Sequence, residues 1–219
     1  MVKLPPFMNS QSLGQFIIKF PVITYRRNTL IADGADVHKY IYFLETGQVK
    51  QYRISTSGSD FLTYLFYPGS FFPPTVLSGV DCSSSYFEAF TAATVRKIPV
   101  EDFMSYLRLN PDLLLELVTL LSRYFGNLSR RINHLAGSSA YQRTAAALVF
   151  IGEEIGNPTQ NQVYIDQVIT HKELAAWSGT ARETTSIHMK SLEKKGLISY
   201  YKRRIKINNW ERLLRETGE

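Results

Sequence analysis

The sequence predicts an α+β fold in three parts: an N-terminal antiparallel β-barrel, a long helix and a C-terminal winged helix-turn-helix. Three observations support this prediction. Short stretches rich in β-branched and aromatic residues alternate with turn signals between residues 20 and 100. A helical periodicity follows and continues to Gly137. Two short capped helices and a strand pair then fill the segment from Ile169 to Ile207.

The first segment is regularly broken by turns. Glycine follows a turn-forming residue at Asp33-Gly34, Thr46-Gly47, Ser57-Gly58 and Pro68-Gly69. Strands spaced roughly 8–12 residues apart are typical of an antiparallel sandwich or barrel. The predicted strands are Ile23–Tyr25, Tyr40–Leu44, Val49–Ile54, Phe61–Phe66, Tyr86–Thr91 and Thr94–Pro99.

A long helix is predicted after residue 109. Asn110 is a good capping residue, Pro111 suits the first helical position and Asp112 complements the helix dipole. Apolar side chains then recur three and four residues apart, as in a coiled-coil seam. The alternative is an amphipathic helix packed on its own barrel, but the seam is longer than a small barrel can cover, which favours a homodimer. The predicted dimerisation residues are Leu114, Leu117, Leu121, Tyr124 and Leu128.

The helix-turn-helix prediction rests on capping signals. Gly137-Ser138-Ser139 indicates a hinge, and a helix is expected from Tyr141 to Ile155. Thr170 and Glu173 then form a capping box, and Ser178-Gly179 ends the short helix that follows. Thr180 and Glu183 form a second predicted capping box, which opens a helix running to about Lys195.

A cationic hairpin follows the second helix. Strands are expected at Gly196–Tyr200 and Ile205–Ile207, around a tip of Tyr201-Lys202-Arg203-Arg204. From Arg182 to Lys206 there are eight Lys or Arg residues and two acids, a net charge of +6 that equals the charge of the whole chain. Such a local field favours contacts with DNA phosphates beside a helix in the major groove. A solvated basic face, or a winged helix that binds another protein, is the alternative.

The chemistry of the side chains sharpens this prediction. Arginine can bond guanine bidentately, and glutamate can accept a hydrogen bond from cytosine N4. Met189 and Leu192 of the second helix are expected to face the core, and Ile187 fits either face. The predicted DNA-binding residues are Thr170, His171, Thr180, Arg182, Glu183, Thr185, Ser186, Lys190, Lys202, Arg203 and Arg204.

These motifs resemble the cyclic-AMP receptor / fumarate–nitrate regulator (CRP/FNR) family of bacterial transcription factors, over nearly the whole chain. The specific part of the match is Glu173-Leu174-Ala175, Ser178-Gly179-Thr180 and Arg182-Glu183-Thr184. The wing matches at Gly196-Leu197-Ile198 and Ile205-Lys206-Ile207. The barrel matches less strongly, at Leu44-Glu45-Thr46-Gly47-Gln48-Val49 and Pro68-Gly69-Ser70-Phe71.

The resemblance implies a cupin-like barrel of the cyclic-nucleotide-binding-domain type and a homodimer on near-palindromic double-stranded DNA. It also makes RNA polymerase a candidate partner. By position, Arg182 and Glu183 would read bases, while Thr170 and His171 would lie near phosphates. The family often has a second arginine where this chain has Ile187, so the half-site is expected to differ from the best-known family consensus. The implied domains are a sensory barrel over residues 1–109, a dimerisation helix over 110–137 and a winged helix-turn-helix over 138–219.

The effector is not identified by the sequence. Family members that bind cyclic nucleotides present a glutamate to the ribose and an arginine to the phosphate; here Pro74 and Ser83-Ser84-Ser85 stand at those positions. A buried phosphate would lack its cation, so control by cyclic nucleotide is not expected. Haem held by His38, His134 or Cys82, and an apolar ligand in the aromatic-rich barrel, are the alternatives.

Composition excludes several other classes. A single cysteine among 219 residues rules out a four-thiolate cluster and a disulfide framework. Neither a membrane span nor an export leader is expected, which favours a cytoplasmic protein. An enzyme is not expected either, because the one compact acid and histidine cluster of the first half, Asp33, Asp36 and His38, lacks metal-binding spacing. No cofactor or metal is predicted.

Overall fold

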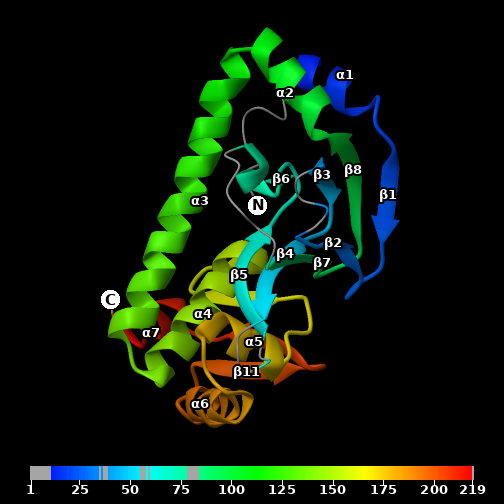
Figure 1. Ribbon diagram of the computed structural model, residues 1–219. Helices are drawn as coiled ribbons and strands as arrows, with labels where there is room; N and C mark the ends of the chain where they lie inside the picture. The colour runs from blue at the N-terminus through cyan, green and yellow to red at the C-terminus, as the bar shows by residue number, and fades with distance from the viewer. Residues whose placement is uncertain are drawn as a thin grey trace. The chain divides into compact units, whose positions relative to one another are not determined.

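The computed structural model describes residues 11–34, 36, 39–54, 58, 60–77 and 84–218 (Figure 1). The chain divides into two compact units, one ending at Leu128 and the other beginning at Ser129. This boundary lies within the long helix α3 (Asp112–Gly137), which the sequence predicted. The predicted division into three functional domains remains a prediction.

The N-terminal unit consists of short strands between helices. Before α3 its elements are α1 (Gln11–Ile17), β1 (Val22–Tyr25), β2 (Leu30–Ala32), β3 (Tyr40–Thr46), β4 (Val49–Ile54), β5 (Asp60–Phe66), β6 (Phe71–Phe72), the 3₁₀ helix η2 (Pro74–Leu77), β7 (Ser85–Ala89), β8 (Ala93–Pro99) and α2 (Val100–Leu109). All six predicted strands are confirmed, as β1, β3, β4, β5, β7 and β8. The very short strands β2 and β6 and the helices α1 and α2 were not predicted.

The strands form two antiparallel sheets. Each is four-stranded, in the orders β1-β8-β3-β6 and β2-β7-β4-β5. The longest ladders pair β3 with β8 and β4 with β5. In the part of the chain that the structure describes, the sheets do not join into a closed barrel, so the expected barrel is a pair of sheets around a common core.

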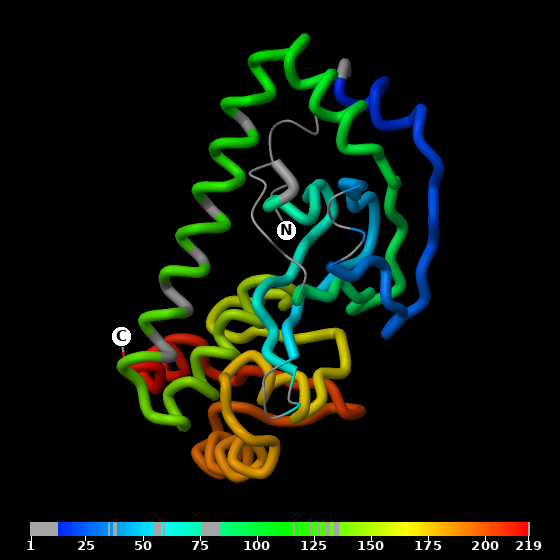
Figure 2. The backbone as a smooth tube through the Cα atoms, in the orientation of Figure 1, coloured from blue at the N-terminus to red at the C-terminus, as the bar shows by residue number. Residues whose placement is uncertain are grey.

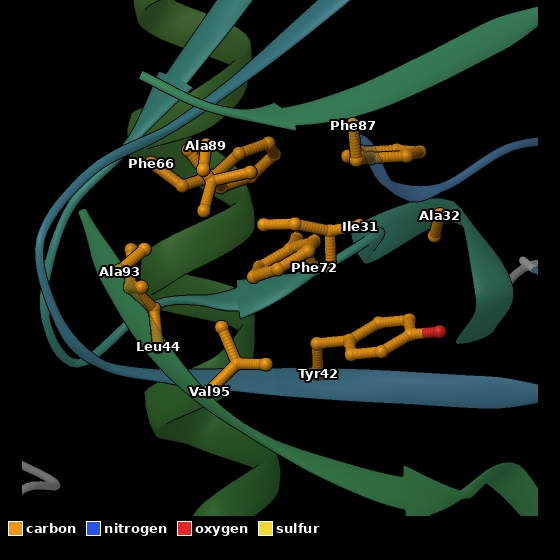
Figure 3. Packing of buried hydrophobic residues seen from close by; sticks show 11 residues of the cluster. Ile31, Ala32, Tyr42, Leu44, Phe66, Phe72, Phe87, Ala89, Ala93 and Val95 are labelled. Atoms are coloured by element: carbon orange, nitrogen blue, oxygen red, sulfur yellow. The ribbon is translucent and has the colours of Figure 1, made fainter. Parts of the chain in front are cut away.

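Aromatic side chains fill the space between the two sheets. Phe66 and Phe87 come from one sheet and Phe72 from the other, and Figure 3 shows them pointing toward one another. The ring centroid of Phe72 lies 5.4 Å from that of Phe66 and 5.7 Å from that of Phe87, within the range of favourable aromatic contacts. Phe66, Phe72 and Phe87 are therefore part of the core of the N-terminal unit.

One glycine is required by the connection between β3 and β4. Gly47 has φ +80°, and a Cβ at this position would lie 2.1 Å from the carbonyl oxygen of Ala92. A larger residue would therefore meet both backbone strain and a clash. This physical requirement accounts for a glycine at a position where the barrel motif was recognised.

A second apolar cluster joins the helices of the N-terminal unit to one sheet. Phe16 of α1 stacks on Tyr106 of α2 with a centroid distance of 4.0 Å. Phe103 of α2 and Leu117 of α3 are buried in the same cluster. The start of α3 is thus fixed to the N-terminal unit.

The C-terminal unit is a winged helix. After the end of α3 its elements are α4 (Ala140–Ile155), β9 (Gly156–Thr159), β10 (Gln162–Ile165), α5 (His171–Ser178), α6 (Arg182–Lys194), β11 (Ile198–Tyr201), β12 (Arg204–Ile207) and α7 (Trp210–Arg215). The sheet order is β11-β12-β10-β9, and the backbone trace in Figure 2 passes from α5 to α6 through a tight turn. The predicted helices and the wing pair are confirmed, whereas the β9–β10 hairpin and α7 were not predicted.

None of the helices in the described part of the chain is long and apolar enough to span a membrane.

Candidate nucleic-acid interface

The first helix of the helix-turn-helix motif begins with the predicted capping box. Thr170 Oγ1 accepts a hydrogen bond from the Glu173 amide at 3.1 Å, and Glu173 Oε2 accepts one from the Thr170 amide at 2.7 Å. Gly179 ends α5 in the left-handed region, at φ +61°. Both the cap and the glycine turn are therefore confirmed.

The second predicted capping box is wrong. Helix α6 begins at Arg182, its N-cap is Ala181, and no side chain caps it. Thr180 comes one residue too early, because its amide still donates to the carbonyl of Ala175 at 3.2 Å and so completes the turn after α5. Its hydroxyl lies 2.7 Å from the hydroxyl of Thr185. Thr180 therefore ties the turn to α6 from the side.

Helix α6 has a buried face and an exposed face. The buried side chains are Thr185, Met189 and Leu192. In the first nine residues of α6, the exposed side chains are Arg182, Glu183, Ile187 and Lys190. The prediction that Met189 and Leu192 face the core is confirmed, and Ile187 belongs to the outer face, with 66% of its surface exposed. Thr185, which was predicted to bind DNA, is fully buried in α6, where its hydroxyl contacts that of Thr180.

His171 connects three elements of the C-terminal unit. It is the first residue of α5, its Nδ1 lies 2.8 Å from Ser186 Oγ of α6, and its Nε2 lies 3.4 Å from the Tyr200 hydroxyl of β11. Ser186 also donates to the carbonyl of Arg182 at 2.9 Å. Burial, with the charge of Glu193 adding to it, raises the pKa of Tyr200 to about 12, so the phenol stays protonated. The side chains of His171 and Ser186 therefore hold α6 against α5 and the wing.

The wing is a tight hairpin with two cations at its tip. Tyr201 pairs with Arg204, and the two residues between them, Lys202 and Arg203, have φ values of +48° and +67°. Both tip side chains are exposed. Arg204 is held differently, because its Nη1 lies 2.6 Å from Oδ1 of Asp166. The cations most available to a partner are therefore those of Lys202 and Arg203.

These elements surround a hollow of about 670 Å³ in the C-terminal unit. Its wall combines the start of α5, the start of α6 and the wing. Lys172, Arg182 and Arg203 are among its lining residues, so cationic side chains that can bind an anionic ligand surround it. The lining residues are Val168, Ile169, Thr170, His171, Lys172, Arg182, Tyr200 and Arg203.

One contributor to this arrangement was missed at the level of sequence. Arg143 of α4 donates through Nη1 to the carbonyl of Ser138 at 2.8 Å and through Nε to the carbonyl of Ser178 at 3.0 Å. The first carbonyl follows the end of α3 and the second belongs to the last residue of α5, so one guanidinium satisfies two helix ends. Nothing in the local sequence identifies the distant Ser178 as a partner.

The residues of the predicted dimerisation seam in α3 differ in how far they are buried. Leu117 is buried in the N-terminal unit, and Tyr124 donates a hydrogen bond to Gln51 at 3.4 Å and lies with its ring centroid 4.3 Å from that of Tyr64. Leu121 and Leu128 are half-buried, and Leu114 is exposed. Among the side chains of α3 that the structure describes, the most exposed apolar ones are Leu115, Val118, Phe125 and Ile132.

The residues considered for an effector are only partly described. Pro74 opens η2, and Ser85 is fully buried and accepts a hydrogen bond from Gln51 Nε2 at 3.3 Å. His38, Cys82, Ser83 and the side chain of His134 lie outside the described residues. Among the described residues, no group of three or more His, Cys, Asp or Glu side chains could hold a metal ion.

Comparison with known sequences and structures agrees with this geometry. Residues 142–216 match the Crp-like helix-turn-helix domain family, and residues 22–110 match the cyclic nucleotide-binding domain family. The transcriptional regulator SdrP of Thermus thermophilus is 31% identical over 159 residues, which cover 72% of this chain and 73% of that protein. The chain belongs to the CRP/FNR family of transcription regulators.

Other CRP/FNR relatives match over most of the chain. The global nitrogen regulator of Nostoc sp. is 27% identical over 191 residues, or 86% of each chain. The cAMP-activated global transcriptional regulator CRP of Pasteurella multocida is 28% identical over 79% of this chain and 82% of its own. A crystal structure of a CRP/FNR-family regulator of Thermus thermophilus aligns with a TM-score of 0.73 and 24% identity, covering 91% of this chain and 99% of that one. This last similarity supports the fold.

Proposed function

We propose that this CRP/FNR-family regulator binds a near-palindromic DNA site as a homodimer and that cyclic nucleotide does not control it. The observation that carries the proposal is the cationic surface made by the outer face of α6 and the wing tip. Arg182 and Glu183 are exposed at the start of α6, and Lys202 and Arg203 are exposed at the tip. A helix of this kind fits the major groove, while the flanking cations neutralise phosphates.

The two exposed residues at the start of α6 are suited to different base edges. Arg182 can donate two hydrogen bonds to guanine, and Glu183 can accept one from cytosine. His171 and Lys172 line the hollow, and their side chains can donate hydrogen bonds to phosphate oxygens. We therefore assign base reading to α6, and positioning on the DNA backbone to the start of α5 and to the wing.

A random-duplex selection with the purified, ligand-free protein tests this assignment. The proposal predicts recovery of a palindrome whose half-sites lie about 10 base pairs apart, centre to centre. Recovery of unselected DNA, retained only at low salt, would contradict it. Retention of DNA only at low salt indicates non-specific attraction to phosphates, which falls steeply as salt rises. That result would favour the alternative, a winged helix that binds another protein.

The outer face of α3 supports dimerisation. Leu115, Val118, Phe125 and Ile132 are each more than half exposed. They stand three and seven residues apart, with Ser122 and Ser129 between them, and so continue a heptad pattern. We propose that this face pairs with the same face of a second copy. The predicted seam, Leu114 to Leu128, would then lie at its border, because Leu117 and Tyr124 pack within their own unit.

Charge placed on this face should separate the protomers. Phe125 is 73% exposed, so Phe125→Glu should leave the folded protomer intact while placing a carboxylate in the proposed interface. Thr119→Glu is the matched control, since Thr119 is exposed about a quarter-turn away from the face. Sedimentation equilibrium should show a monomer for Phe125→Glu and a dimer for Thr119→Glu. A dimeric Phe125→Glu variant would move the interface elsewhere.

The cyclic-nucleotide proposal concerns the N-terminal unit. The family relative from Pasteurella multocida is named as cAMP-activated, but Pro74 and Ser85 supply neither the carboxylate nor the cation that such a ligand needs. Added cAMP should therefore leave the thermal unfolding midpoint unchanged, because a ligand that does not bind cannot stabilise the fold. An upward shift would contradict the proposal. A haem or an apolar ligand is the alternative effector, and bound haem would be detected by its absorbance of visible light.

RNA polymerase is a further proposed partner. A regulator that binds promoters would work in the cytoplasm and meet RNA polymerase there. We assign no residues to the contact with RNA polymerase.

A further inference from the structure

Ile187 is the apolar member of an otherwise polar stripe on α6. Glu183, Ile187 and Lys190 are four and three residues apart, so they lie along one side of the helix, and all three are exposed. Ile187 is 66% exposed. Single exposed apolar residues are common on protein surfaces. This one stands on the face that the proposed function directs into the major groove.

The core of the C-terminal unit does not account for Ile187. The core-facing side of α6 is formed by Thr185, Met189 and Leu192, which are at most 1% exposed. At about 100° per residue, Ile187 lies roughly 200° around the helix from Thr185 and from Met189. The side chain thus points away from the core and is not needed to fill it.

The floor of the major groove offers one kind of apolar group. Adenine, guanine and cytosine present hydrogen-bonding atoms, and thymine adds its C5-methyl. Isoleucine cannot satisfy a base donor or acceptor, so over other base pairs it would displace water without replacing its hydrogen bonds. Against a thymine methyl, the same side chain removes apolar surface from water on both partners.

We propose that Ile187 reads a thymine methyl in each half-site and thereby determines specificity at one base pair. The proposal rests on the proposed function, because it requires α6 to lie in the major groove. Ile187 is about 6 Å along the helix axis from Glu183, and base pairs are stacked about 3.4 Å apart. The thymine therefore belongs to a different base pair from the one that Glu183 reads.

Replacing thymine by uracil in the selected site tests this inference. Uracil lacks the C5-methyl and keeps the hydrogen-bonding edge, so each half-site thymine is replaced in turn and the dissociation constant is measured by fluorescence anisotropy. The wild-type protein should lose about fourfold in affinity per half-site at one position, as expected for one buried methyl group. Ile187→Ala should bind the thymine and uracil duplexes equally at that position.

Two further variants sharpen the comparison. Ile187→Val keeps a branched apolar side chain and should retain most of the preference for thymine. Glu193→Ala, an exposed position of α6 outside the stripe, should keep the full thymine-to-uracil ratio. Because Ile187 is exposed, its variants should unfold at the wild-type temperature.

The outcomes separate the inference from the proposed function. A selected palindrome in which no thymine-to-uracil replacement lowers the affinity would overturn the role of Ile187 and leave the proposed function standing. A uracil effect that persists in Ile187→Ala also overturns it, because another residue would then contact the methyl. Failure to select any sequence overturns both.

Discussion

The Nδ1 atom of His171 lies 2.8 Å from Oγ of Ser186, so a side chain at the start of α5 is joined to the middle of α6. The other ring nitrogen of His171 reaches the Tyr200 hydroxyl on the wing. Two predicted DNA-binding residues thus contact each other in the free protein. Under the proposed function, the orientation of α6 in the major groove would depend on a hydrogen bond within the protein.

Removing this bond should weaken specific binding while preserving the number of phosphate contacts. Ser186→Ala deletes the hydrogen bond to His171 together with the bond that the hydroxyl donates to the Arg182 carbonyl within α6. Loss of the bond between the two helices, at a cost of about 1 kcal/mol, corresponds to roughly a fivefold loss of affinity. Anisotropy titrations at several salt concentrations should give an unchanged salt slope. Lys172→Ala is the contrasting variant, because losing one phosphate contact should lower the slope by about one. A lower slope for Ser186→Ala would mean that its hydroxyl bonds a phosphate instead.

Arg182 should act on sequence preference more than on general affinity. Arg182→Ala removes a bidentate donor, at a cost of about 1–3 kcal/mol on the correct site, and should relax the preference at one base pair per half-site. Repeating the duplex selection with this variant measures the preference. Arg203→Ala, at the wing tip, should weaken binding to all sequences alike. An unchanged preference in Arg182→Ala would remove it from the base-reading set.

The two residues at the wing tip should lower the stability of the C-terminal unit and strengthen DNA binding. Lys202 and Arg203 both have positive φ, a conformation for which a two-residue turn prefers Asn-Gly. The double variant Lys202→Asn, Arg203→Gly should therefore stabilise the C-terminal unit by about 1 kcal/mol and weaken DNA binding. Urea unfolding followed by tryptophan fluorescence isolates this unit, because both tryptophans, Trp177 and Trp210, belong to it.

A second double variant separates strain from charge at the tip. Lys202→Gln, Arg203→Gln keeps the strained turn and removes both cations. It should bind DNA as weakly as the Asn-Gly variant without its gain in stability. DNA affinity equal to the wild type in both variants would show that the tip does not touch DNA.

The C-terminal unit should be destabilised by acid through Glu216. Hydrogen bonds from Lys195, at 2.7 Å, and from the Tyr141 hydroxyl hold the pKa of Glu216 below its usual 4.5. A carboxyl whose pKa is lowered in the folded state adds stability above its unfolded pKa, and this stability is lost as the pH falls through the folded value. Glu216→Gln should therefore flatten the pH dependence of unfolding below about pH 4.5.

Tryptophan fluorescence during thermal unfolding provides the measurement for Glu216. Glu211→Gln, which removes an exposed carboxylate from α7, the helix that Glu216 follows, should leave the pH dependence as in the wild type. Parallel pH profiles for wild type and Glu216→Gln would show that the contact with Lys195 adds no stability.

Local signals predicted the elements that depend on neighbours in sequence. Strand β4 was predicted with its observed bounds, because apolar and β-branched residues end at turn signals on both sides. Thr170 and Gly179 likewise act within a few residues of themselves, as cap and turn. Thr180 looked equivalent to Thr170, but α6 begins one residue later than predicted, with Ala181 as its N-cap, and the Thr180 hydroxyl lies 2.7 Å from the Thr185 hydroxyl.

Tertiary contacts decided what the sequence could not. Both the Leu117 side and the Phe125 side of α3 are apolar, so periodicity alone could not tell which of them packs on the N-terminal unit. The hydrogen bond from Tyr124 to Gln51, 73 residues away in the sequence, shows that the Leu117 side of α3 packs on the N-terminal unit. Arg143 and Asp166 were missed for the same reason, since each meets a partner that lies far away in the chain.

The proposed function is tested most directly by the affinity of the ligand-free protein for its selected palindrome and for a single half-site, each measured over a range of salt concentrations. A homodimer on DNA predicts two protomers on the palindrome, much weaker binding to the half-site, and a steep fall in affinity as salt rises, because cations of both wings would contact phosphates. Equal affinity for the palindrome, the half-site and unrelated DNA would contradict it.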